Sequence, residues 1–382
     1  MLARRRTSQR PAFTLVEILI VIALIGVLAG ILLVAVGGAT DAAKRARTKS
    51  TMESLSAAID AFVLEHGELP GIVPVHVLHH EHESEGAYIT STQNILLALL
   101  GGARVSVADD AGEPLDATAE AEYQRYLAEA VASDDGAWYE FTIEDEHHPL
   151  QFNVIVRPRQ IGRGPWVNGK QYPPYLSPKD HELLERWSGD YQSDTPDGPA
   201  NLGVTEGYTA LPDLIDAWGQ PILVFRHDRS TGPILPPDED ALPQFWPNGI
   251  DRYLGATRLG RMGERQLTKV GDDTQGSRIG LNSADENERN YWLYLLLSHP
   301  SMRWDYGDAD APVYSGTARA GYAMLSAGPD GIFLGRHDGP IDESDGAPID
   351  PSDYPAGSGD IAEGKDHERL DEFDDVIMYG GS

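Results

Sequence analysis

A long apolar run near the N-terminus constrains the fold of this chain more than any other stretch. From Ile18 to Thr40 no residue carries a charge, and most of the side chains are aliphatic. An apolar helix needs about 20 residues to cross the hydrocarbon core of a bilayer. The run therefore predicts a membrane-spanning helix, and the rest of the chain is then a soluble part attached to it.

Residues 1–12 precede this helix and predict its orientation. They include four arginines, Arg4, Arg5, Arg6 and Arg10, and no acidic residue. A short basic leader before an apolar block is typical of an export signal, and its arginines keep that end of the chain in the cytoplasm. An ordinary secretory signal would instead be cleaved after the apolar region, where small residues at 29–30 and 37–39 offer sites. That alternative removes the helix from the mature protein.

The segment Ala12-Phe13-Thr14-Leu15-Val16-Glu17, with the aliphatic residues after it, resembles the cleavage and methylation segment of type IV pilins and type II secretion pseudopilins. The resemblance implies that a prepilin peptidase cuts between Ala12 and Phe13 and methylates the new amine, so the helix stays in the mature protein. Ala12 replaces the glycine that usually precedes the cut. Glu17 matches the glutamate that, in this family, neutralises the N-terminal amine of a neighbouring subunit. In a filament core without water, an unpaired carboxylate or amine would be costly.

Two further features concern how this helix packs and where it ends. Gly26 and Gly30 form a G-x-x-x-G pair, which lets two membrane helices approach closely, although glycine is also common in such helices without that role. Beyond residue 41 apolar residues recur at three- and four-residue steps, so we expect the helix to continue as far as Gly67. The apolar positions of this stripe include Met52, Leu55, Ile59, Phe62 and Val63.

Three later segments resemble the major pseudopilins of type II secretion. Asp216–Leu223 is similar to their D-P-W-G-N-P-Y element, with departures at three positions. Tyr322–Gly331 is similar to the family's strand and S-x-G-x-D-G turn, and Phe373–Tyr379 is similar to its terminal D-D-I strand. The resemblance implies an α+β, pilin-like fold. In that fold a long N-terminal helix, membrane-spanning and then amphipathic, packs on a C-terminal antiparallel β-sheet head, here with large insertions.

The expected organisation divides the chain into five parts. These are a basic leader at 1–12, a transmembrane helix at 13–40, the amphipathic half of the long helix at 41–70, an expanded αβ region at 71–215, and a β-rich pseudopilin-like head at 216–382 with an insertion at 233–315. Local patterns add helices at 91–100, 114–132 and 291–297, and strands at 138–143 and 151–156.

Two groups of residues are candidate metal sites. Major pseudopilins hold a calcium ion between the D-G turn and aspartates of the C-terminal segment, and the resemblance places Asp330, Asp374 and Asp375 at those positions. Calcium takes six to eight oxygen ligands. The alternative is that Asp330 caps a turn and that the other two are solvated. The second group has zinc-ligand types but is better explained as a polar surface loop; it consists of His76, His79, His80 and His82 with Glu81, Glu83 and Glu85.

The charge of the chain and its missing motifs exclude several functions. The formal charge is −30, from 30 basic and 60 acidic residues. So acidic a soluble part repels phosphate backbones, and we expect no nucleic-acid partner. The chain has no cysteine, which excludes thiolate metal sites, a catalytic cysteine and disulfides. It also has no G-x-S-x-G elbow, Walker loop or dinucleotide fingerprint, so we expect no enzymatic activity.

These patterns together predict a structural role, as a pseudopilin subunit of a type II secretion-type filament that supports protein secretion. The precursor would span the inner membrane once, with a cytoplasmic N-terminus and a periplasmic head, and would enter a periplasmic filament. Its expected partners are copies of itself, other pseudopilins, the prepilin peptidase, the inner-membrane assembly platform and the membrane, with calcium as cofactor. The alternatives are a type IV pilin-like surface filament subunit, and a membrane-anchored periplasmic binding or enzymatic domain with a pilin-type signal.

Overall fold

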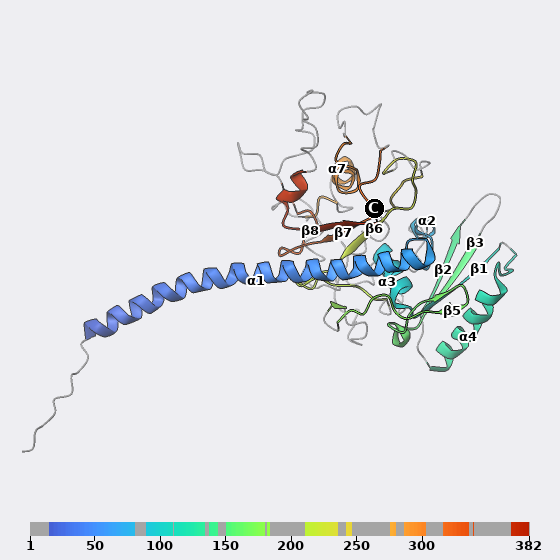
Figure 1. Cartoon of the computed structure of the whole chain (residues 1–382), viewed down its shortest axis with the longest axis horizontal. Coiled ribbons are helices and arrows are strands. Elements are labelled where there is room, and N and C mark those ends of the chain that lie inside the picture. Colours follow the sequence, from blue (N-terminus) through green and yellow to red (C-terminus); the bar gives the residue numbers. More distant parts are fainter. Residues whose placement is uncertain are drawn as a thin grey trace, which may run out of the picture. The chain divides into compact units, whose positions relative to one another are not determined.

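The computed structural model describes helices and small antiparallel sheets, with one long helix at the N-terminal end (Figure 1). The α+β expectation is therefore confirmed. Two compact units, Met1–Ala46 and Arg47–Ser382, make up the chain, and each is considered by itself. The described residues are 15–80, 89–109, 111–133, 137–143, 150–179, 182–183, 211–235, 242–246, 276–279, 286–302, 316–335, 339 and 368–381. At positions 17, 29, 31–37, 79–80, 137–143 and 286–288 the description covers the backbone alone.

Helix α1 comprises Leu15–His66, as the continuous apolar pattern predicted. It ends at Gly67, which adopts a φ of 80° and donates its N–H to the carbonyl of Val63 at 2.7 Å. A glycine in the left-handed region is the usual residue at this position, because a side chain there would be strained. None of the helices formed by the described residues has a stretch both long and apolar enough to span a membrane.

The first sheet of the larger unit has packed side chains on both faces. It consists of β6 (Leu223–Arg226), β7 (Tyr322–Ser326) and β8 (Val376–Gly380) in the order β6-β7-β8, all antiparallel. One face packs on α7 (Glu286–Leu297), and the other packs on α1 through Met52, Leu55 and Ile59. In Figure 1 the sheet lies between these two helices.

Helix α3 (Ser91–Leu100) connects this sheet to the rest of the unit, and all of its residues are buried. Its N-terminus has a capping box, in which Thr90 accepts the N–H of Gln93 and the Gln93 side chain accepts the N–H of Thr90. This arrangement satisfies two backbone donors that the helix itself leaves unpaired. The hydroxyl of Thr92 then bonds β6, since it donates to the Ile222 carbonyl at 3.2 Å and accepts the Val224 N–H at 3.0 Å.

The second sheet follows α3 and is covered by a helix on one face. It contains β1 (Ala103–Ala108), β3 (Leu150–Val156) and β2 (Ala137–Ile143) in the order β1-β3-β2, again antiparallel. Helix α4 (Ala117–Ser133) packs on it through Tyr123, Tyr126 and Ala130, which contact Ile155. On the opposite face the sheet packs against α2 (Val75–His80) and α3. Strands β2 and β3 and helix α4 agree with the sequence prediction, whereas β1 and α2 were not predicted.

Four short elements complete the described structure. The 3₁₀ turns η2 (Pro158–Gln160) and η8 (Arg369–Glu372) precede loops. Strands β4 (Trp166–Val167) and β5 (Lys170–Gln171) form a hairpin closed by Asn168 and Gly169, with φ values of 49° and 76°. Positive φ at both central residues is typical of a type I′ turn, for which Asn-Gly is the preferred pair.

Candidate functional site

The N-terminal processing and assembly residues are only partly described. Ala12 and Phe13 lie outside the described residues. Glu17 lies in α1, but its side chain is outside the described part, so its role remains a prediction. Gly26 and Gly30 both lie in α1, and a methyl group added at either would have no atom within 4 Å. Among the described atoms of the unit Met1–Ala46, nothing therefore packs on these two positions.

The three predicted calcium ligands each contact the backbone of residues 328–334, in the loop that follows β7. Asp330 accepts the N–H of Ile332 at 2.7 Å. Both carboxylate oxygens of Asp375 lie within 3.2 Å of the Leu334 nitrogen. Asp374 packs on the start of the same loop, where a Cβ at Gly328 would lie 2.6 Å from the Asp374 carbonyl oxygen. The C-terminal aspartates therefore contact the loop that contains Asp330.

These carboxylates do not by themselves form a metal site. Within the described ranges, no group of three or more His, Asp or Glu side chains is arranged to hold an ion. Asp330 and Asp375 each accept a backbone N–H of the loop, which is the turn-capping role given above as the alternative for Asp330. The acidic residues at 336–338 and 340–367 lie outside the description. Calcium binding accordingly remains a prediction.

Of the histidines considered as zinc ligands, only His76 has a described side chain. Its Nδ1 lies 3.6 Å from Oδ2 of Asp228, beside the first sheet. The hydrogen bond with His76 lowers the pKa of Asp228 below its usual range. The side chains of His79 and His80 and all of residues 81–88 lie outside the described part. Sequence spacing gave no signal for this pair, because its members are far apart in the chain.

Two of the three pseudopilin-like segments contact each other through a buried aspartate. Asp216 accepts the N–H groups of Trp218 and Gln220, each at 2.8 Å, and the hydroxyl of Ser326 at 2.7 Å. Burial raises the pKa of Asp216 despite these donors. Ala217, which follows Asp216, donates its N–H to the Thr48 hydroxyl of α1 at 3.1 Å. The turn thus connects β7 to the long helix.

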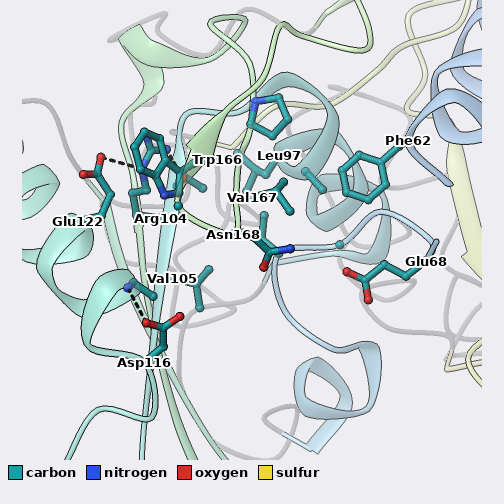
Figure 2. Close-up of a pocket in the computed structure, with 17 residues that line it drawn as sticks. Phe62, Glu68, Leu97, Arg104, Val105, Asp116, Glu122, Trp166, Val167 and Asn168 are labelled. Carbon is teal, nitrogen blue, oxygen red and sulfur yellow. Dashed lines mark hydrogen bonds and ion pairs between the residues drawn. The ribbon is translucent and has the colours of Figure 1, made fainter. Parts of the chain in front are cut away.

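A cavity of about 230 Å³ lies beside the second sheet, and sequence reasoning did not find it. The end of α1, helix α3, strand β1, the start of α4 and the β4–β5 hairpin all contribute to its lining (Figure 2). Its buried floor includes Phe62, Leu97 and Ala98, whereas Glu68 and Asp116 are exposed at its edge. The Asn-Gly pair at 168–169 and the Arg within the alternating strand 103–108 are signals that could have pointed to it.

Arg104 and Glu122 form an ion pair in the cavity wall. The Nε of Arg104 lies 3.5 Å from Oε1 of Glu122, and Nη1 donates to the Ala103 carbonyl at 2.7 Å. The guanidinium also lies over the rings of Tyr126 and Trp166, at 4.4 and 5.0 Å from their centroids. Burial lowers the pKa of Arg104, which is only 9% exposed. An aromatic ring stabilises a cation over its face, so the buried charge is compensated on several sides.

Comparison with known proteins identifies the N-terminal segment. Residues 8–33 match the prokaryotic N-terminal methylation motif. The chain therefore carries the prepilin-type signal of type IV pilin-like and pseudopilin proteins, as its sequence predicted. No curated protein and no solved structure is significantly similar to the chain.

Proposed function

We propose that the protein is a pseudopilin, a structural subunit without enzymatic activity in a type II secretion-type filament. The observation that carries this proposal is the methylation motif at 8–33, which indicates processing by a prepilin peptidase and assembly with other pilin-like subunits. The uncharged run 18–40 within and beyond this motif supports a single inner-membrane span before assembly. The head would then be periplasmic.

Contacts within the larger unit support the narrower assignment to type II secretion. The D-A-W-G turn at Asp216 bonds the serine of the S-A-G-P-D-G segment, and the C-terminal aspartates pack on the loop of that segment. The three pseudopilin-like segments thus form one connected structure around β7. Residues 103–156, which form the second sheet with α4, would be an expansion relative to a compact pseudopilin.

Processing and assembly can be tested with the full-length chain expressed together with a prepilin peptidase. We expect mass spectrometry to find a mature N-terminus at Phe13, carrying one methyl group. Ala12→Gly should be cut at least as efficiently, because glycine is the usual residue before the cut. Cleavage beyond residue 29, or no cleavage, would contradict the proposal.

Glu17→Ala separates a filament subunit from the alternative of a membrane-anchored binding domain. We expect the variant to be processed but to lose cross-linked multimers, because the amine of the next subunit would have no partner. Glu53→Ala, an exposed glutamate further along α1, is the matched control and should assemble normally. Unchanged multimers in Glu17→Ala would favour the anchored domain, to which the cavity beside the second sheet would belong.

We also propose that calcium binds near the loop containing Asp330. The support is the close approach of Asp374 and Asp375 to this loop, with carboxylate and carbonyl oxygens of the type that calcium prefers. Saturating calcium should stabilise the full-length protein by about 1–3 kcal/mol and raise its Tm, and a chelator should reverse this. Asp330→Asn keeps an acceptor for the Ile332 N–H but loses the charge, so it should reduce the response. An unchanged Tm in the wild type would refute the calcium proposal while leaving the filament proposal intact.

A further inference from the structure

We infer that the cavity beside the second sheet binds an alkylammonium group, supplied either by a lysine side chain of another protein or by a free small amine. This inference does not depend on the proposed filament role. It rests on the size of the cavity, its apolar floor, and the charges that its own residues leave uncompensated.

The size and floor of the cavity fit a short hydrocarbon chain. Its volume of about 230 Å³ exceeds the roughly 150 Å³ of an apolar protein cavity that accommodates benzene. Leu97, Ala98 and Ala103 form a buried apolar base, to which Val105 and Val167 add further aliphatic surface. An alkyl stem in this space would remove apolar surface from water, which favours binding.

The positive charge in the wall is already matched, so the cavity does not favour an anion. Arg104 pairs with Glu122, and its Nη1 donates to a backbone carbonyl. Glu122 in turn receives two bonds from Arg125, which lies outside the lining, at 2.6 and 3.0 Å. Figure 2 shows the Arg104–Glu122 pair at one side of the cavity, below the Trp166 ring. A bound carboxylate would have to displace Glu122 from this arrangement.

Two carboxylates at the edge of the cavity are not matched in this way. Asp116 caps α4 through Oδ1, which accepts the N–H groups of Thr118 and Ala119 at 2.7 and 3.2 Å. No bond to its Oδ2 is found among the described residues, and none to either oxygen of Glu68. Figure 2 places Asp116 and Glu68 on different sides of the space beside Val105 and Asn168. They leave the edge with two negative charges that an ammonium group would compensate.

The guanidinium of Arg226 interacts electrostatically with Glu68. Arg226 is behind the cavity wall, where a Cβ at Gly71 would be 2.4 Å from its Nη1. That Nη1 donates to the Pro70 carbonyl at 3.2 Å, and Arg226 does not line the cavity. It therefore offsets part of the charge of Glu68. The other cation, Arg104, is a lining residue and is paired with Glu122. The excess at the edge remains negative, in agreement with a chain of net charge −30.

Titration of the full-length protein in detergent with two amines tests the inference. Ligand-observed NMR would follow n-pentylamine, as a free amine, and Nα-acetyl-lysine methylamide, as a lysine side chain. The uncharged controls are n-pentanol and Nα-acetyl-norleucine methylamide. We expect saturable binding of at least one amine and no saturable binding of its control. Stronger binding of the lysine compound would indicate a protein partner, and stronger binding of pentylamine would indicate a small-molecule ligand.

Variants locate the binding and separate it from partition into the micelle. Glu68→Gln and Asp116→Asn should each weaken binding about two- to fivefold, as expected for an exposed ion pair. Asparagine is also a good N-cap, so Asp116→Asn leaves the start of α4 intact. Glu53→Gln, which removes the same charge from an exposed site on α1, should leave binding unchanged. No binding in the wild type, equal binding of the uncharged controls, or equal affinity in all three variants would overturn the inference, as would preferential binding of Nα-acetyl-aspartate methylamide.

Discussion

The two three-stranded sheets of the larger unit are stabilised in different ways. In the β6-β7-β8 sheet every residue of the central strand is buried, and polar groups bond to partners far along the chain, as Ser326 does with Asp216. In the β1-β3-β2 sheet the covering helix α4 is attached at its edges by charged groups. Arg157 bonds Glu129 at 2.8 Å, and its guanidinium lies 4.9 Å from the centroid of the Tyr126 ring.

This difference predicts how the stability of each sheet responds to substitutions and to pH. A buried strand with satisfied polar groups loses stability mainly through cavities and unpaired donors. Ion pairs near the surface are screened and are worth little individually. The first sheet should therefore determine the global stability of the unit, and the α4 layer should open locally at lower cost.

The largest expected effect comes from truncating the central strand of the first sheet. Leu325→Ala should lower the free energy of unfolding by about 2–5 kcal/mol, because Leu325 of β7 is fully buried in the cluster that includes α7. Ile155→Ala in the second sheet should lie near the lower end of that range, since its cluster under α4 is small and can collapse. Leu64→Ala, which removes the same atoms from a side chain that is 90% exposed, is the control. Denaturant unfolding of the full-length chain measures all three, and a larger loss at Ile155 would reverse the comparison.

An intermediate effect is expected where a buried amide joins α3 to the loop after α1. The Asn94 side chain accepts the N–H groups of Ile72 and Val73 and donates to the Val73 carbonyl. Asn94→Ala leaves these groups without that partner and should cost about 1–3 kcal/mol. Ser106→Ala, which removes a hydroxyl bonded to Glu120 at the edge of the second sheet, should cost about 1 kcal/mol or less. Both side chains are buried, so equal losses in thermal unfolding would show that the number of hydrogen bonds removed does not determine the cost.

The smallest effect should appear as the pH is lowered. Although burial acts to raise the pKa of Glu122, the bonds and charges of Arg125 and Arg104 outweigh it and lower this pKa. Glu122 therefore contributes stability above its unfolded-state pKa of about 4.3, and this contribution is lost as the pH falls through the lower folded-state value. Asp216 has a raised pKa, so its contribution is present below about 3.9 and is lost as the pH rises through the folded-state value.

Acidification to about pH 3 should therefore loosen α4 before β7 opens, by at most about 1 kcal/mol. Hydrogen exchange followed by mass spectrometry resolves the two regions. Glu122→Gln should remove this part of the pH dependence, whereas Glu53→Gln should not. If α4 and β7 lost protection together, the acid response would not lie in the Arg–Glu pairs.

The sequence allowed the prediction of elements whose patterns are local. Helix α3 begins and ends where its capping residues and the Gly101-Gly102 pair indicate, and α4, β2 and β3 follow their periodicity. The uncharged apolar run at 18–40 and the periodic apolar stripe that follows it likewise predicted α1. The strand β1 was missed because Arg104 interrupts its apolar residues, and the side chains that accommodate this arginine, a tyrosine, a tryptophan and a glutamate, come from other elements.

Pairings between distant residues could not be predicted in the same way. Nothing in the local sequence indicates that His76 approaches Asp228, or that Glu68 and Asp116 lie at the edge of one cavity. The contact of Asp374 with the Gly328 turn was not predicted either, since the resemblance gave Asp374 only as a calcium ligand and the two residues are far apart in the chain. Such contacts depend on the closure of long loops, which leaves no periodic signal.

The two ends of the 103–156 segment lie next to each other. Arg157 donates its N–H to the Gly102 carbonyl at 2.8 Å, so the segment leaves and rejoins the chain at a single hydrogen-bonded point. Gly101 and Gly164 meet at the same crossing, where a Cβ at Gly101 would lie 1.9 Å from the Gly164 carbonyl oxygen. A short turn could therefore close the chain where the segment begins and ends. Helix α3 would then keep its bonds to β6 through Thr92 but would lose the contacts that Leu97 makes with the second sheet.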